Sequence, residues 1–469
     1  MTERQVSPLP EAARNRVLAH AAAQSGVMNG LAQALWQRPE LGYLEQESSA
    51  ALAAACEAAG FAVTRGVADL PTAFVARRRR GDGPVIGLLA EMDALPGFSQ
   101  DASPRRSPIP GQSNGHACGH HLFGAASVGA ALALAAWQDE TGTGGEIRLY
   151  GCPAEEGGAG KVYMARAGLF DDLDIALHWH PDDCNTVWQS RSLASIGARV
   201  RFHGRTAHAA QSPEQGRSAL HGLEAFHHMA ALLREVVPQG SHIHYVTLQG
   251  GLAPNVIPDF AESHVNVRHP DPRIAAEIFA RLEAAAEGAA LGTGTRAEVV
   301  RLGAVHSILP NATVGAVMQA NMAVLPRIRW SDEERAWAEE LQQSFDTPPP
   351  LERIGQLDPY RFDLQGAFSS DVGDVSWIAP TGALGTATWV PGTRPHTWQA
   401  VAAGGMSIGW KGMQAAAEGL AVSAAQFLSD PALVAAARKD HRAARGEGYR
   451  YRALVGEAPP PLDYQRDHG

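Results

Sequence analysis

Four separate segments of the sequence carry side chains that bind transition metals, and each segment follows an apolar stretch. A thiol and an imidazole lie in GHACGHH, adjacent carboxylates in PAEEGG, two imidazoles in LHWHP and one in RPHTW: Cys118 and His120; Glu155 and Glu156; His178 and His180; His396. Thiolate, imidazole and carboxylate ligands together suit zinc, manganese, cobalt or nickel better than calcium or magnesium. A cysteine and a histidine two positions apart do not lie side by side on a helix, but a tight loop at Gly119 can bring them together.

The adjacent acids Glu155 and Glu156 are the least ordinary of these residues. Burying two neighbouring carboxylates costs free energy unless a cation or hydrogen-bond donors compensate. On a loop, one acid can bind a metal while the other takes a proton from metal-bound water, whose pKa such an ion lowers to about 7. Taken singly, each candidate also fits an ordinary core or surface residue, because a chain with 19 histidines places some together by chance. The combination favours hydrolysis.

Other chemistries have less support. The sequence has no C-x-x-C and no G-x-x-x-x-G-K-[ST] motif, which disfavours a thioredoxin-like site and nucleotide hydrolysis. A Cys118 nucleophile with a histidine base stays open, although it leaves both glutamates and His396 without a role.

Buried strands and small-residue helices are expected to position the four segments. Residues 84–97, 144–158 and 171–181 read as strands that end in polar residues. Residues 11–24, 47–60 and 123–137 have the apolar spacing of helices. Alternating helices and strands predict an α/β sheet with functional loops at the strand ends.

The pattern changes near residue 190. Alternating apolar and polar residues at 195–210, 241–251 and 261–270, with helical patterns at 218–237 and 272–291, predict a small open-faced α+β domain. We therefore expect a first catalytic segment (1–190), an inserted domain (191–308), a second catalytic segment (309–430) and a C-terminal tail (431–469). The tail is charged and rich in proline, and we expect it to be loosely held.

Length and composition limit the class of protein. A chain of 469 residues predicts two domains, and the net charge of −10 argues against nucleic acid and anionic membranes as partners. No run of roughly 20 apolar residues predicts a membrane span. The basic run 77–80 reads as a solvated strand end and turn. Four cysteines in so long a chain are not a disulfide framework, so a reducing cytoplasmic location is expected.

Several motifs together resemble one family. AEMDALPG, GHACGHH, PAEEGGAGKVYMARAGLFDDLDIALHWHP, GRTAHAAQSPEQGRSAL, GGLAPNVIPD and RPHTWQA occur in this order over most of residues 30–430. They are similar to the two-metal aminoacylase/carboxypeptidase family of metallopeptidase-like amidohydrolases. Within it they resemble the branch of p-aminobenzoyl-glutamate hydrolases, auxin-conjugate hydrolases and hippurate hydrolases. The resemblance implies a zinc-peptidase-like α/β catalytic domain, with a mixed sheet flanked by helices, interrupted by a small α+β lid or dimerisation domain.

The resemblance also implies roles for single residues. The implied metal ligands are Cys118, His120, Glu156, His180 and His396. Glu155 matches the general base. The family's middle histidine, counted without gaps, falls 24 residues after Glu156 at His180, whereas the Leu-His dipeptide favours His178. The gap-free count is preferred, and both side chains can face the site because alternate strand residues share a face.

Further residues match positions around the metals and the substrate. Asp93 is expected to orient a ligand, with a purely structural role as its alternative. In the lid, His208 matches a histidine that polarises the scissile carbonyl. Asn255 and Arg268 match a pair that holds a substrate carboxylate, although Arg268 also fits a surface strand. His121 stands where relatives have Asp or Asn, and it reads as a spare ligand, a substrate contact or a neutral replacement.

These matches imply a metal-dependent amidohydrolase that acts on amide bonds other than ordinary peptide bonds. The expected substrate is an N-acyl or N-aroyl amino acid, first a p-aminobenzoyl-glutamate-like conjugate. Two divalent metal ions are expected, Mn²⁺ or Zn²⁺ before Co²⁺ or Ni²⁺. The chain is expected to form a homodimer or to pair with a related subunit. The alternatives are an indole-acyl-aspartate hydrolase, a peptidase, a deacetylase, an aromatic deaminase, or a binding protein without catalysis.

Overall fold

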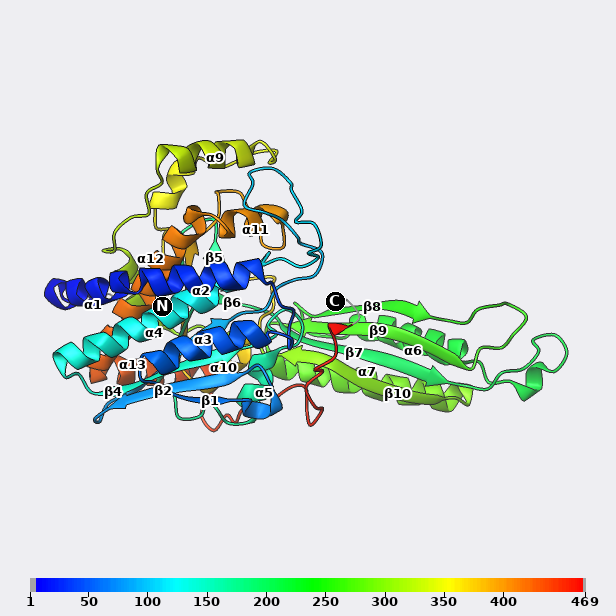
Figure 1. Ribbon diagram of the computed structural model, residues 1–469. Helices are drawn as coiled ribbons and strands as arrows, with labels where there is room; N and C mark the ends of the chain where they lie inside the picture. Colours follow the sequence, from blue (N-terminus) through cyan, green and yellow to red (C-terminus); the bar gives the residue numbers. More distant parts are fainter. Residues whose placement is uncertain (1–5, 467–469) are drawn as a thin grey trace.

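An eight-stranded mixed sheet forms the centre of the larger part of the molecule (Figure 1). The computed structural model describes residues 6–466. The strand order is β1-β2-β4-β3-β5-β12-β6-β11. The strands are β1 (Ala62–Arg65), β2 (Phe74–Arg80), β3 (Val85–Glu91), β4 (Gly145–Cys152), β5 (Ile175–Asp182), β6 (Thr186–Arg191), β11 (Arg361–Gln365) and β12 (Thr381–Ala387). The four central strands β4, β3, β5 and β12 are parallel, so their carboxyl ends meet at one edge.

Helices cover this sheet on both faces, as the α/β prediction required. They are α1 (Glu11–Ala23), α2 (Ser25–Gln37), α3 (Gln46–Ala58), α4 (His120–Thr141), α5 (Gly160–Arg166), α8 (Ala312–Met322), α9 (Asp332–Gln342), α10 (Val372–Ile378), α11 (Trp398–Gly404), α12 (Ser407–Ser429) and α13 (Pro431–Arg445). Short 3-10 helices span Val67–Asp69, Pro213–Gln215 and Leu351–Gly355.

Helix α4 lies in the core between the sheet and helices α1, α2 and α12. Its run of alanine and glycine lets neighbouring helices approach closely, and nearly all of its residues are buried. The helix is long and apolar enough to span a membrane, but 94% of its apolar window is buried inside the protein. It therefore serves as a core helix that carries His120 at its first position.

The inserted domain, called the lid below, is a separate four-stranded antiparallel sheet backed by two helices. Its strands, in the order β10-β7-β9-β8, are β7 (Ala194–His203), β8 (His242–Gln249), β9 (Phe260–His269) and β10 (Arg296–Val305). Its helices are α6 (Ala219–Arg234) and α7 (Pro272–Thr293), which cover one face. The mixed catalytic sheet and the inserted α+β domain are confirmed. Strand β10 is an addition that the sequence patterns did not predict.

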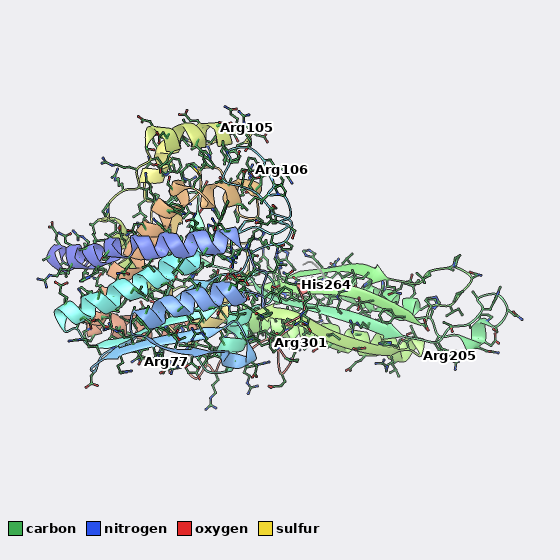
Figure 2. The ribbon with its side chains drawn as sticks, in the orientation of Figure 1. Arg77, Arg105, Arg106, Arg205, His264 and Arg301 are labelled. Carbon is green, nitrogen blue, oxygen red and sulfur yellow. The ribbon has the colours of Figure 1, made fainter. Side chains whose placement is uncertain are left out.

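The expectation of a loosely held tail is wrong for the part of the tail that the structure describes. Residues 431–445 form α13, in which the buried His441 lies 2.8 Å from the carbonyl oxygen of Ser376. The chain then packs back over both domains. The Tyr451 hydroxyl donates to Asp374, and Arg301 of β10, labelled in Figure 2, donates to the carbonyl of Leu454. Tyrosine and leucine side chains, which the charged composition obscured, anchor the tail.

The basic run lies in β2 and is shared between solvent and acidic partners. Arg77 is exposed on this outer strand (Figure 2), while Arg78 pairs with Asp139 and Arg79 pairs with Glu146. These pairs fit a solvated strand end.

Candidate metal centre and active site

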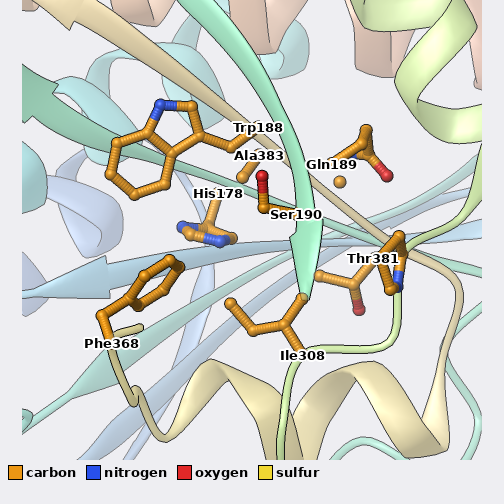
Figure 3. Close-up of a pocket in the computed structure, with 10 residues that line it drawn as sticks. His178, Trp188, Gln189, Ser190, Ile308, Phe368, Thr381 and Ala383 are labelled. Atoms are coloured by element: carbon orange, nitrogen blue, oxygen red, sulfur yellow. The ribbon is translucent and has the colours of Figure 1, made fainter. Parts of the chain in front are cut away.

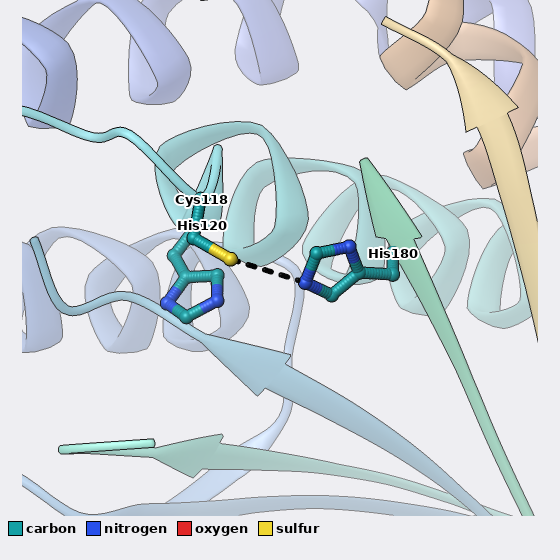
Figure 4. Close-up of side chains that lie close together, drawn as sticks. All are labelled: Cys118, His120 and His180. Atoms are coloured by element: carbon teal, nitrogen blue, oxygen red, sulfur yellow. Dashed lines mark hydrogen bonds between the residues drawn. The ribbon is translucent and has the colours of Figure 1, made fainter. Parts of the chain in front are cut away.

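Cys118 and His180 meet where the loop before α4 crosses the end of β5 (Figure 4). Gly119 between Cys118 and His120 has a φ of 75°. A Cβ atom on it would lie 2.8 Å from Pro181, so only glycine allows this approach. The Cys118 Sγ consequently lies 3.4 Å from His180 Nε2. The His180 Nδ1 is 2.7 Å from the carbonyl of Pro181, which leaves Nε2 directed at the thiol.

His120 has one ring nitrogen in use and one without a hydrogen bond. Its Nδ1 lies 2.9 Å from Asp93 Oδ1, and the ring is fully buried. Its Nε2 makes no hydrogen bond although Glu91 Oε2 is 3.1 Å away. A carboxylate behind one nitrogen and a lone pair on the other is the arrangement of a histidine that binds a metal.

The two glutamates lie in a turn after β4. Asp93 fixes this turn as well, because its Oδ2 accepts a hydrogen bond from the backbone N–H of Glu156 at 2.9 Å. The His396 Nε2 lies 2.9 Å from Glu156 Oε1. His396 has a φ of 60°, an unusual conformation for a non-glycine residue, and its backbone N–H donates to Ala117.

These side chains form overlapping groups of donor atoms. In each group, one atom per residue lies within 4.8 Å of the others: Cys118, His120 and His180; Cys118, Glu156 and His396; Glu91, His120 and Glu155. A soft thiolate, neutral imidazoles and carboxylates at this spacing fit a borderline divalent ion such as zinc or manganese. The buried His120 Nε2 without a hydrogen bond is the observation that supports this fit.

A buried lysine lies behind the cluster. The Lys161 Nζ is 2.7 Å from Glu91 Oε1 and 2.6 Å from Asp371 Oδ1, and all three side chains are almost inaccessible. Although burial opposes it, Lys161 lowers the pKa of Glu91 to about 2. Burial raises the pKa of Asp371 to about 6 despite the same lysine. The acids of this cluster therefore differ strongly in how readily they hold a proton.

Glu155 is the acid best suited to hold a proton. Burial, followed by the charges of Glu91 and Glu156, raises the pKa of Glu155 well above its usual value. For Glu156 burial acts in the same direction, but the hydrogen bond from His396 outweighs it and lowers the pKa. Neighbouring residues in the chain thus favour opposite protonation states, as a proton acceptor and a metal ligand require.

His178 and His121 lie outside the donor groups. His178 is one row further back on β5 and lines a cavity instead. The His121 Nε2 is 3.1 Å from the carbonyl of Gly404, and burial lowers the pKa of this ring to about 3. His121 is therefore a neutral packing residue, which corresponds to the third of its predicted readings.

The lid residues lie at its two ends. His208 forms a bridge to Val256, and the backbone N–H of Ala209 donates to Asn255, so both predicted residues lie at the free tip. Arg268 lies at the other end of β9, beside the first domain, and its Nε donates to Asn266. The ten residues of β9 span roughly 30 Å. Within one chain His208 and Asn255 do not reach the cluster.

Three residues near the cluster escaped the sequence patterns: Lys161, Asp371 and Tyr464. The Tyr464 hydroxyl donates to the carbonyl of Glu156 at 3.0 Å. A lysine two residues beyond a glycine-rich turn reads as exposed, and the other two residues come from segments remote in sequence. The Gly-Lys of GGAGKV, directly after the glutamates, was the one available signal.

Comparison with known proteins agrees with this geometry. Residues 193–293 match the family described as a peptidase dimerisation domain of M20 type. The chain is 38% identical over 440 residues to the second (B-type) subunit of p-aminobenzoyl-glutamate hydrolase from Escherichia coli, covering 88% of this chain and 91% of that protein. An aminobenzoyl-glutamate utilization protein from Klebsiella pneumoniae has the same fold, with a TM-score of 0.60 at 21% identity over 88% of this chain and 98% of the other. A dinuclear metal-binding M20 peptidase from Bacillus subtilis gives 0.58 at 21% identity, over 87% and 99%.

Proposed function

Because the chain belongs to the M20 family of peptidases and amidohydrolases, we propose that it hydrolyses the amide bond of N-acyl or N-aroyl amino acids in a metal-dependent reaction. A p-aminobenzoyl-glutamate-like conjugate is the first candidate substrate, by similarity to the Escherichia coli protein. One observation carries the proposal. The buried His120 Nε2, backed by Asp93 and without a hydrogen bond, faces the thiol, imidazole and carboxylate groups that a divalent ion requires.

Five residues would hold two divalent ions, Mn²⁺ or Zn²⁺ first: Cys118, His120, Glu156, His180 and His396. When bound, such ions activate water as a nucleophile and polarise the scissile carbonyl. Asp93 keeps the His120 ring and the glutamate turn in place through its two oxygens.

Glu155 would move the proton. It lies beside Glu91 and His120, where its raised pKa favours proton uptake at its carboxylate. It accepts a proton from the attacking water and returns it to the nitrogen of the leaving amino acid. The intact pair of glutamates argues against a binding protein that has lost its chemistry.

The lid supports a dimer. Several large apolar side chains are exposed on β8 and the tip, with Leu252 97% exposed: Val246, Leu248, Leu252 and Val256. An apolar surface of this kind favours contact with a second subunit. We propose that His208 of the partner subunit approaches the cluster, since His208 cannot do so within its own chain.

Replacement of the proposed base tests the mechanism. The control is Glu418→Gln, because Glu418 is also a partly exposed carboxyl whose pKa is raised by burial, but it lies on α12. We expect Glu155→Gln to lower turnover of p-aminobenzoyl-glutamate roughly 100-fold or more, with metal content per chain unchanged. The control variant should keep wild-type turnover. Turnover of Glu155→Gln within about tenfold of wild type, with metals bound, would refute the proposed role.

Metal content tests the centre itself. Purified wild type should carry near two equivalents of a transition metal, and Cys118→Ala should carry less. No transition metal in either protein, after reloading has been attempted, would remove the hydrolase proposal.

A further inference from the structure

A cavity with aromatic walls lies beside the metal cluster and has no role in the chemistry described above. Trp188 on β6 and Phe368, in the loop between β11 and α10, have ring centroids 5.9 Å apart at an angle of 55°. Together with His178 they line its inner end, as Figure 3 shows. Ser190 and both aromatic rings also line a wider outer cavity of about 420 Å³. The two cavities are thus adjoining parts of one space.

The sheet leaves this space open because β12 has small residues there. His178, Ala383 and Trp188 stand in register across β5, β12 and β6. In the next row His180 and Thr186 flank Gly385, where a Cβ would lie 3.2 Å from Trp188 Nε1. The small residues form a floor between the histidines of β5 and the indole of β6.

The cavity adjoins the proposed reaction centre directly. The Trp188 ring stacks on the ring of His180, with centroids 5.7 Å apart and planes 19° apart. A group attached to the carbonyl carbon of a substrate at the cluster would therefore be within one ring's width of the indole. This location corresponds to the acyl substituent of an amide.

Fixed contacts hold the walls before any substrate binds. The backbone carbonyl of Phe368 accepts from Leu193 at 2.8 Å, and the Ser369 hydroxyl donates to the carbonyl of the same leucine. Three residues further along, Asp371 is paired with the buried Lys161. The aromatic ring is thus carried on a loop tied at both ends, which lowers the entropy cost of binding against it.

The lining favours an uncharged flat group. Among the described residues that line the inner cavity, none is Lys or Arg, so a substrate carboxylate has no cation there. The outer cavity opens beside Arg353, Asp358 and Arg361, where a polar ring substituent stays in contact with water. Stacked aromatic pairs prefer offset or tilted rings, the geometry that the two walls present.

We infer that Trp188 and Phe368 form the acyl subsite of this chain, and that it selects a benzoyl-type ring attached directly to the scissile carbonyl. This inference rests on the proposed amide hydrolysis. It adds the two residues that discriminate aroyl from short alkanoyl substrates.

The test compares two substrates that differ only in the acyl group, N-benzoyl-glutamate and N-acetyl-glutamate. The quantity is the ratio of their kcat/KM values for wild type, Trp188→Leu, Trp188→Phe and Phe368→Leu. We expect each leucine variant to lower the benzoyl-to-acetyl ratio by roughly tenfold, and the phenylalanine variant to keep it within about threefold. The control is Trp410→Leu, a half-buried tryptophan on α12, which should leave the ratio unchanged.

Binding of benzoate, measured by calorimetry, provides a readout without turnover. Wild type should bind benzoate at least about tenfold more tightly than Phe368→Leu, a variant that does not touch His180. If wild type cleaves both substrates and neither leucine variant changes the ratio or the benzoate affinity, the subsite is refuted and the hydrolase stands. A changed preference among amino acids instead of acyl groups also refutes it. If wild type cleaves neither substrate but binds benzoate through these rings, the hydrolase proposal fails and the subsite remains.

Discussion

Removing the buried charge of Lys161 should destabilise the fold strongly. The Lys161 Nζ lies within 2.7 Å of Glu91 and Asp371, and the side chains of the three residues are at most 2% exposed. In Lys161→Met both carboxylates keep their burial and lose their shared cation. Breaking a buried pair by removing one partner costs about 3–5 kcal/mol, and we expect a loss in that range at pH 8.

The loss should become smaller as the pH falls. Asp371 already has a pKa raised to about 6 by burial in the presence of the lysine, and removing the cation raises it further. An acid whose pKa is raised in the folded state binds its proton more tightly there than in the unfolded chain. Protonation therefore stabilises the folded variant at low pH, and the difference from wild type should be least near pH 5.

Urea unfolding of metal-free protein at fixed concentration measures this effect. A double-mutant cycle with Asp371→Asn separates the pair from its surroundings, and the double variant should lose at least about 1 kcal/mol less than the sum of the single variants. The control is Lys439→Met on the exposed side of α13, which should change stability by less than about 0.5 kcal/mol. A loss below about 1 kcal/mol in Lys161→Met, or additive single effects, would refute the view that this buried network depends on the lysine.

Three further predictions follow from single contacts around the cluster and tail. Asp93→Asn should weaken metal binding by roughly 10–100-fold in a competitive chelator titration, because it disturbs the ring of His120; an unchanged affinity would contradict the orienting role. Tyr464→Phe removes the hydroxyl that holds the Glu156 carbonyl and should lower kcat by about fivefold with KM unchanged; loss of stability alone, with kcat intact, would count against it. Burial lowers the pKa of His441 to about 4, so wild type should lose up to about 3 kcal/mol as the pH falls from 6.5 to 4, and His441→Gln should lose correspondingly less; parallel acid curves would rule this out.

The local parts of the site were readable from sequence because their cause is local. The C-G-H spacing predicts a turn that brings Cys118 and His120 together, and the structure shows that turn at Gly119. The choice between His178 and His180 required the third dimension. Both residues face the same side of β5, but only His180 reaches the thiol, because the loop before α4 crosses at the last row of the strand.

The missed features depend on contacts between remote segments. Strand β10 is half-exposed along most of its length and lacks strong alternation, so pairing with β7 defines it more than its own sequence does. The tail reads as solvated because arginine and proline dominate its composition. Its position is set by a few aromatic residues, above all Tyr451 and Tyr464, whose partners lie tens or hundreds of positions away in the chain.

The same reasoning explains why acidic side chains can gather at this site. Adjacent carboxylates such as Glu155 and Glu156 are unfavourable unless opposite charge lies near them. The structure supplies that charge unevenly, with Lys161 on one side beside Glu91 and His396 on the other beside Glu156. Glu155 lies between them and receives neither ion pair among the described contacts, so it is the carboxyl left to take up a proton. A divalent ion at the thiol and imidazoles would add positive charge on the side of Glu156 and widen this difference, which is the asymmetry that a base beside a ligand requires.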